Sequence, residues 1–164
     1  MIEAKVEGMA LDLATNSPVV ILAPISLMNK VLPIWIGHHE AWGIAMHLSG
    51  VAAKRPMTWD LMKTVIDSLS ATVERVEITE LHEATFYARL CLARNGEKFN
   101  IDARPSDSIA VAVRTGARIF VNEELFNLDL REAPDESPPL PNDPETLRDR
   151  LRKINPEDFG KYNL

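Results

Sequence analysis

The sequence predicts an α+β fold, with one domain that contains a mixed or antiparallel β-sheet and packed helices. The chain length supports one domain, because 164 residues with 46% apolar content can bury a sizeable core. The hydrophobic pattern supports both classes of element, because segments of roughly alternating apolar residues are interrupted by three segments with helical spacing. Gly, Pro and Asn stand between these segments and mark their ends.

The strands are expected in two groups. The segments "IEAKVEGMALDL" and "VVILAPI" are separated by the turn signal "TNSP" and predict an opening hairpin, and "VLPIWIG" predicts a short buried strand. Later, "TVERVEITEL" and "TFYARLCLAR" alternate around residues 82–84 as a second hairpin. The "NG" turn at 95–96 then predicts that "KFNIDA" returns as a third strand, and "RIFV" closes the sheet.

Three helices are expected, over residues 38–48, 58–69 and 106–115, with Gly50 and Gly116 just beyond the first and the last. The apolar run in the last helix predicts burial on nearly all sides. "RPMTWD" and "RPSDSI" each place Arg-Pro before a hydroxyl residue at a helix start, so Thr58 and Ser106 are expected as helix caps. An isoleucine that ends a strand stands eight residues before a helical Ile-Ala in both halves, which suggests an internal strand–helix duplication.

The charge distribution limits the possible partners. Residues 122–145 contain eight acidic residues and one basic residue, a net of −7, while the whole chain carries −6. The body before this segment is therefore nearly neutral and lacks the broad basic surface with which proteins grip nucleic acid. Any contact with DNA or RNA is expected to be local and to depend on a few arginines. The longest apolar run has seven residues, so no membrane contact is expected.

The tail and the single cysteine complete the organisation. We expect a domain over residues 1–128, an acidic, proline-rich linker over 129–143, and an amphipathic helix with a short tail over 144–164. Cys91 has no cysteine partner within the chain, and the first residues lack the pattern of a signal peptide, so a cytoplasmic location is predicted. The unanchored tail helix and two tryptophans near helix starts favour a homo-oligomer.

Several blocks of the sequence resemble the bifunctional nuclease domain family, formerly a domain of unknown function. The blocks are "LPIWIGHHEAWGIA", "RPMTWDL", "FYARLCL", "IDARPSDSIAVAVRTGARIFV" and a following "EE". The resemblance implies a single α+β domain found as an oligomer. It also implies a nuclease that cleaves phosphodiester bonds in both DNA and RNA.

The matching polar positions are the candidate site residues that the resemblance implies. The catalytic candidates are Glu40, Asp60, Arg104 and Asp107, and the substrate-binding candidates are Arg55, Thr58 and Ser106. Asp102, Glu123 and Glu124 also match. The family usually has histidine between the Thr and Asp of the second block, where this sequence has Trp59. A general base at that position would be lost here, whereas tryptophan can replace a residue that only packs.

The residues themselves leave three interpretations open. Asp60 and Asp107 stand in the first turns of helices, where a carboxylate is favourable by about 0.3–1 kcal/mol and could simply pair with Arg55 and Arg104. Arg104 and the free N–H groups of the following helix could instead hold a phosphate. In the third interpretation, carboxylates converge on Mg²⁺ or Mn²⁺, with Glu40, Asp102 and Asp107 as candidate ligands. A non-catalytic oligomeric binding or regulatory module remains the alternative function.

Overall fold

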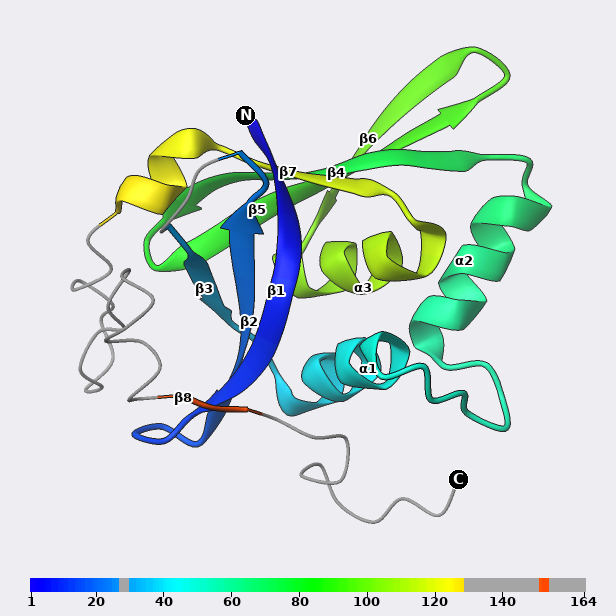
Figure 1. The fold of residues 1–164 in the computed structure, drawn as a ribbon. Helices are drawn as coiled ribbons and strands as arrows, with labels where there is room; N and C mark the ends of the chain where they lie inside the picture. The colour runs from blue at the N-terminus through cyan, green and yellow to red at the C-terminus, as the bar shows by residue number, and fades with distance from the viewer. Residues whose placement is uncertain (27–29, 129–150, 154–164) are drawn as a thin grey trace.

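The computed structural model describes residues 1–26, 30–128 and 151–153, and its α+β architecture matches the predicted fold class. A single mixed sheet bends around helix α3, and α1 and α2 lie against α3 (Figure 1). The elements are, in chain order, β1 Ile2–Asp12, β2 Ser17–Pro24, β3 Leu32–Trp35, α1 His38–Leu48, α2 Thr58–Ser68, β4 Thr72–His82, β5 Thr85–Arg94, β6 Glu97–Ala103, α3 Pro105–Thr115, β7 Arg118–Val121, the 3₁₀ helix η1 Glu123–Asn127 and β8 Leu151–Lys153.

The strand order explains why the sheet is mixed. The order is β3-β2-β1-β7-β4-β5-β6, and the two predicted hairpins, β1–β2 and β4–β5, are both present and antiparallel. Strand β7 joins the halves, because it lies antiparallel to β1 and parallel to β4. Each half is a three-stranded antiparallel meander followed by a helix, α1 or α3. This is the arrangement that the proposed strand–helix duplication would produce.

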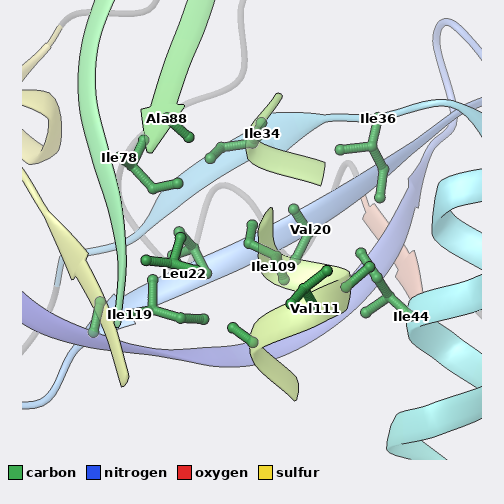
Figure 2. Close-up of a cluster of buried hydrophobic side chains, with 14 of the residues drawn as sticks. Val20, Leu22, Ile34, Ile36, Ile44, Ile78, Ala88, Ile109, Val111 and Ile119 are labelled. Carbon is green, nitrogen blue, oxygen red and sulfur yellow. The ribbon is translucent and has the colours of Figure 1, made fainter. Parts of the chain in front are cut away.

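Helix α3 is the centre of the core. The expected burial of the apolar run Ile109–Val113 is confirmed for residues 109–112, which expose at most 1% of their surface, while Val113 is half-buried. Their neighbours in Figure 2 come from the sheet and from α1, and include Val20, Leu22, Ile78 and Ile44. A helix held on several sides is a rigid support, so side chains at its two ends have fixed positions. No helix among the described residues is long and apolar enough to cross a membrane.

The C-terminal segment differs from the expectation. Leu151–Lys153 forms strand β8, which pairs antiparallel with Ala10 to Asp12 of β1, so the predicted helix is wrong for these three residues. The physical reason lies in β1, where β7 pairs only with residues 2–4 and leaves the same edge open further along. Backbone pairing with this edge outweighs the helical pattern of the sequence. The expected linker at 129–143 and the rest of the expected helix lie outside the described residues.

Candidate functional site

Helices α1 and α3 begin close to each other, and the side chain of Trp59 reaches the start of α3 from α2. Glu40 lies in the first turn of α1, Trp59 in the first turn of α2 and Asp107 in the first turn of α3, which follows Arg104. Arg104 Nη2 lies 2.8 Å from Glu40 Oε1, and Trp59 Nε1 donates a hydrogen bond to Asp107 Oδ1 at 3.2 Å. We call these four residues the helix-start cluster. Because each helix has a partial positive charge at its amino end, the amino ends of α1 and α3 both place positive charge near Arg104.

Arg104 connects the helix-start cluster. Its Nε lies 2.7 Å from Asp107 Oδ2, so the predicted pair with Asp107 is present, and the second bond to Glu40 was not expected from the sequence. The hydrogen bond to Asp107 outweighs the opposite effect of burial and raises the pKa of Arg104. The Arg104 side chain is nevertheless 66% exposed, whereas Glu40 is 13% exposed. The guanidinium is therefore held on two sides and open to solvent on another.

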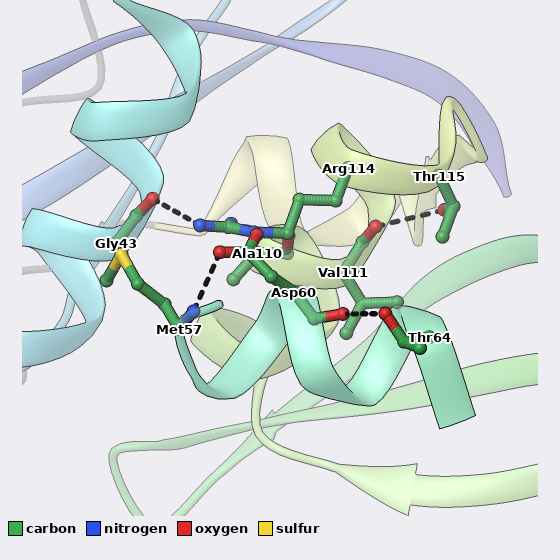
Figure 3. A network of polar contacts seen from close by, with 8 residues as sticks. All are labelled: Gly43, Met57, Asp60, Thr64, Ala110, Val111, Arg114 and Thr115. Atoms are coloured by element: carbon green, nitrogen blue, oxygen red, sulfur yellow. Dashed lines mark hydrogen bonds and ion pairs between the residues drawn. The ribbon is translucent and has the colours of Figure 1, made fainter. Parts of the chain in front are cut away.

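Asp60 belongs to a second network, at the other end of α3. Arg114 Nε lies 2.6 Å from Asp60 Oδ1, and the remaining Arg114 nitrogens donate to the carbonyl oxygens of Gly43 and Ala110 (Figure 3). Burial alone would raise the pKa of Asp60, but hydrogen bonds from Arg114 and from the Met57 N–H lower it below its ordinary value. The Arg114 side chain is only 4% exposed. This network ties α1, α2 and α3 together.

The expected pairing of Asp60 with Arg55 is thus wrong, and Arg114 is the residue that the sequence reasoning missed. Arg55 is exposed in the loop before α2, with no ion pair among the described residues, while Arg114 lies on the last turn of α3, directly against the start of α2. A signal was available in the sequence. A single arginine that directly follows a buried apolar run needs buried acceptors, because its charge cannot be left unpaired.

The expected helix caps are also wrong. The N-cap residues of α2 and α3 are Met57 and Arg104, and neither Thr58 nor Ser106 caps a helix through its hydroxyl. Thr58 lies one position too late, because it is the first helical residue of α2, and Ser106 lies two positions too late, because Pro105 already begins α3. At the start of α2 the Asp60 carboxylate makes the side-chain hydrogen bond instead, because it accepts a hydrogen bond from the Met57 N–H at 2.9 Å. Thr58 is exposed and Ser106 is buried, so they do not form a common binding surface.

Trp59 is a packing residue in this structure. Its side chain is buried, and its ring lies 5.6 Å from the Arg114 guanidinium and 5.5 Å from the His39 ring. Helix α1 passes so close that a Cβ added to Gly43 would lie 2.1 Å from Trp59 Cζ3. An indole that fills this space and also donates to Asp107 accounts for tryptophan here by packing, without an acid–base role.

The candidate metal ligands do not form a cation site as they lie. Glu40 and Asp107 both contact Arg104, and the Arg104 guanidinium lies between the two carboxylates. Asp102 is exposed on β6, and the described residues contain no group of three His, Cys, Asp or Glu that could hold a metal ion. Mg²⁺ and Mn²⁺ prefer several oxygen ligands around one point, which this arrangement does not offer. Glu123 and Glu124 are exposed on η1.

A hollow of about 350 Å³ lies beside the second network rather than at the helix-start cluster. It is bordered by the end of α1, the loop before α2, and the Asp60–Arg114 pair. Arg104, Glu40 and Asp107 are absent from its lining. The two polar networks are therefore separate sites. Asp60 does not lie with Glu40 and Asp107, although the sequence analysis named all three as catalytic candidates.

Comparisons with known proteins agree with the family resemblance seen in the sequence. The model of the bifunctional nuclease domain matches residues 20–132. An uncharacterized protein of Mycobacterium tuberculosis is 36% identical over 163 residues, which cover 96% of this chain and 97% of that protein. Bifunctional nuclease 2 of Arabidopsis thaliana is 32% identical over 103 residues, and bifunctional nuclease 1 of Oryza sativa subsp. indica is 30% identical over 100 residues. These matches cover 60% and 59% of this chain, but only 31% and 30% of the plant proteins. The chain belongs to the bifunctional nuclease domain family.

Proposed function

We propose that this protein cleaves phosphodiester bonds in DNA and RNA with little sequence specificity, and that Arg104 binds the phosphate. Membership of the bifunctional nuclease domain family supports the reaction class. The observation that carries the choice of residue is the meeting of the amino ends of α1 and α3 at one exposed arginine. Helix amino ends and guanidinium groups are the two features that most often hold phosphate in proteins.

The charges of the cluster favour a weak and local contact. Glu40, Asp107 and Arg104 sum to −1, and the amino ends of α1 and α3 contribute about half a positive charge each. The sum is about zero, so one phosphate can be accommodated at the exposed guanidinium but a long stretch of nucleic acid is not strongly attracted. The nearly neutral body agrees with this, because broad basic surfaces supply most non-specific affinity. Exposed Arg55, three residues before α2, is positioned to contact a neighbouring phosphate.

The chemistry assigns different roles to the members of the cluster. Water attacks phosphorus as the bond to the leaving sugar oxygen breaks, and that oxygen keeps the electron pair of the bond and takes a proton from solvent. Arg104 neutralises the charge that grows on the phosphoryl oxygens. Asp107, 27% exposed and bonded to Arg104, accepts the proton of that water. Glu40 is a positioning residue, because it lies mostly buried and fixes the guanidinium. Asp60 is left out of the reaction, since its contacts are with Arg114 and Met57. No step uses a metal ion.

A non-catalytic oligomeric module is the second candidate, and one observation favours it. Asp107, Glu40 and Asp60 are each within ion-pair distance of an arginine, so the helix starts are already neutralised without a ligand. Buried or half-buried pairs of this kind can serve the fold alone.

The two candidates are separated by one set of variants. Purified wild-type protein, Arg104→Ala and Asp107→Asn are assayed on supercoiled plasmid and on RNA, with Mg²⁺, with Mn²⁺ and with chelator. Arg118→Ala is the matched control, because Arg118 is also 66% exposed but its nearest carboxylate, Glu3, is 4.0 Å away. We expect cleavage by the wild type and the control, and its loss in Arg104→Ala with a melting temperature changed by no more than about 2 °C.

Other outcomes would reject the nuclease assignment. If the wild type cleaves neither substrate under any of the three conditions, the non-catalytic module is the better description. If Arg104→Ala and Asp107→Asn lower the melting temperature equally while cleavage survives, the cluster is structural and the catalytic site lies elsewhere.

A further inference from the structure

Strand β6 is an open edge of the sheet. It is the last strand in the order, and within the described residues it pairs only with β5. Its residues from Glu97 to Asp102 are all exposed. In Figure 1 the β5–β6 hairpin projects away from the helices, so no helix covers its tip. An edge strand of seven residues presents a row of backbone N–H and C=O groups that can pair with another strand.

One face of this edge is apolar. Phe99 is 44% exposed and Ile101 is 45% exposed. They lie opposite Leu92 and Leu90 of β5, so they share a face with side chains of the core. The other face of β6 carries Lys98, Asn100 and Asp102, because successive side chains alternate. The apolar face of the sheet therefore continues beyond the part that helices cover.

We propose that β6 pairs antiparallel with β6 of a second copy of this chain, about a two-fold axis at Asn100. In this register Lys98 lies opposite Asp102 of the other copy, and Phe99 lies opposite Ile101. Both relations occur twice because the interface is symmetric. Each copy therefore supplies an opposite charge for Lys98 and Asp102 of the other copy and an apolar neighbour for its Phe99 and Ile101. The two sheets then form one continuous sheet across the interface.

The sequence of the strand selects this register. A two-fold axis through an antiparallel pair keeps each side chain on its own face, so the axis must pass through a residue position. An axis at Lys98 or at Asp102 would place like charges opposite each other. An axis at Phe99 or Ile101 would leave Lys98 and Asp102 without opposite charges and would shorten the overlap. Only the axis at Asn100 pairs all seven residues of the strand and matches the opposite charges.

The charged side chains are available for this contact. Asp102 has no ion pair among the described residues. Lys98 Nζ lies 3.3 Å from Glu74 Oε2 on β4, but the Lys98 side chain is 70% exposed. A surface pair of this kind is weak, so the ammonium group can turn to a carboxylate that is held directly opposite it.

The test uses sedimentation of the full chain at micromolar concentration, with Lys98→Asp, Asp102→Lys and the double variant that carries both. We expect the wild type to have twice the mass of the 18.3 kDa chain. Each single variant should dissociate at least tenfold more readily, because like charges then lie opposite each other. The double variant should dimerise again, and an equimolar mixture of the two single variants should form a mixed dimer. Lys5→Asp on β1 is the control for an equal change of charge and should stay dimeric.

Three results would overturn the proposal. A monomeric wild type removes the interface altogether. Assembly that persists in both single variants shows that another surface joins the copies. Loss of assembly in the single variants without recovery in the double variant or in the mixture excludes this register. Circular dichroism of every variant shows that each one is folded, so a loss of assembly can be assigned to the interface.

Discussion

Replacing Gly43 with alanine tests how closely α1 and α2 are held together by Trp59. The added Cβ would lie 2.1, 2.6 and 3.0 Å from three carbons of the six-membered ring of the indole. Favourable contacts between carbon atoms lie near 3.5–4.0 Å, so the ring or the helix must move by more than 1 Å. The ring cannot move freely, because its Nε1 is bonded to Asp107 and Arg114 and His39 lie close to it.

The magnitude follows from two opposing effects. Alanine is a better helix former than glycine by about 1 kcal/mol, which favours the variant. Overpacking of a well-filled core costs about 1–3 kcal/mol, and a contact of 2.1 Å places this site at the upper end of that range. We therefore expect Gly43→Ala to lower the free energy of unfolding by about 1–2 kcal/mol.

A second substitution should reverse the sign of the stability change that Gly43→Ala causes. Trp59→His removes the six-membered ring that the new Cβ would meet, although it costs stability itself through the lost burial. In that background Gly43→Ala should be neutral or stabilising by up to about 1 kcal/mol. The two changes should therefore be coupled by about 2 kcal/mol, within the range for residues in direct contact.

The measurement is urea unfolding of the wild type, both single variants and the double variant. Gly8→Ala is the control, since an added Cβ there meets nothing within 4 Å. Equal destabilisation by Gly43→Ala in both backgrounds would refute the reasoning, because the indole would then not set the distance between the helices. If Trp59→His does not fold, Trp59→Leu supplies the second background.

Three further predictions concern other parts of the chain. The pKa of Asp60 lies below its ordinary value of 3.8, so its pair with Arg114 stabilises the fold above that pH and is lost as the pH falls through the folded pKa. Asp60→Asn should therefore flatten the acid side of the curve of unfolding free energy against pH, and an unchanged curve would contradict this. Burial, together with nearby Glu77, raises the pKa of the Cys91 thiol, so the native protein should react with a thiol reagent much more slowly than the urea-unfolded chain. Truncation after Leu130 removes β8 but no residue of the core cluster, so the shortened chain should still melt cooperatively; a molten product would show that β8 is required.

The sequence alone determined the positions of most elements. Local signals predicted the hairpins, the strand before α1 and all three helices. These signals are the hydrophobic period, the turn residues and the glycines just beyond α1 and α3. The burial of α3 was also visible in its apolar run, and the pair of Arg104 with Asp107 was one of the interpretations that the sequence left open.

The tertiary structure decided which charged groups meet. Asp60 was matched to nearby Arg55 by sequence, but it pairs with Arg114, 54 residues away. Trp59 donates to Asp107, 48 residues away, and Glu40 reaches Arg104 from another helix. These contacts depend on how α1 and α2 pack on α3, which no local pattern encodes. The same reason explains β8, because the open edge of β1 exists only after β7 has taken its place beside the first residues of that strand.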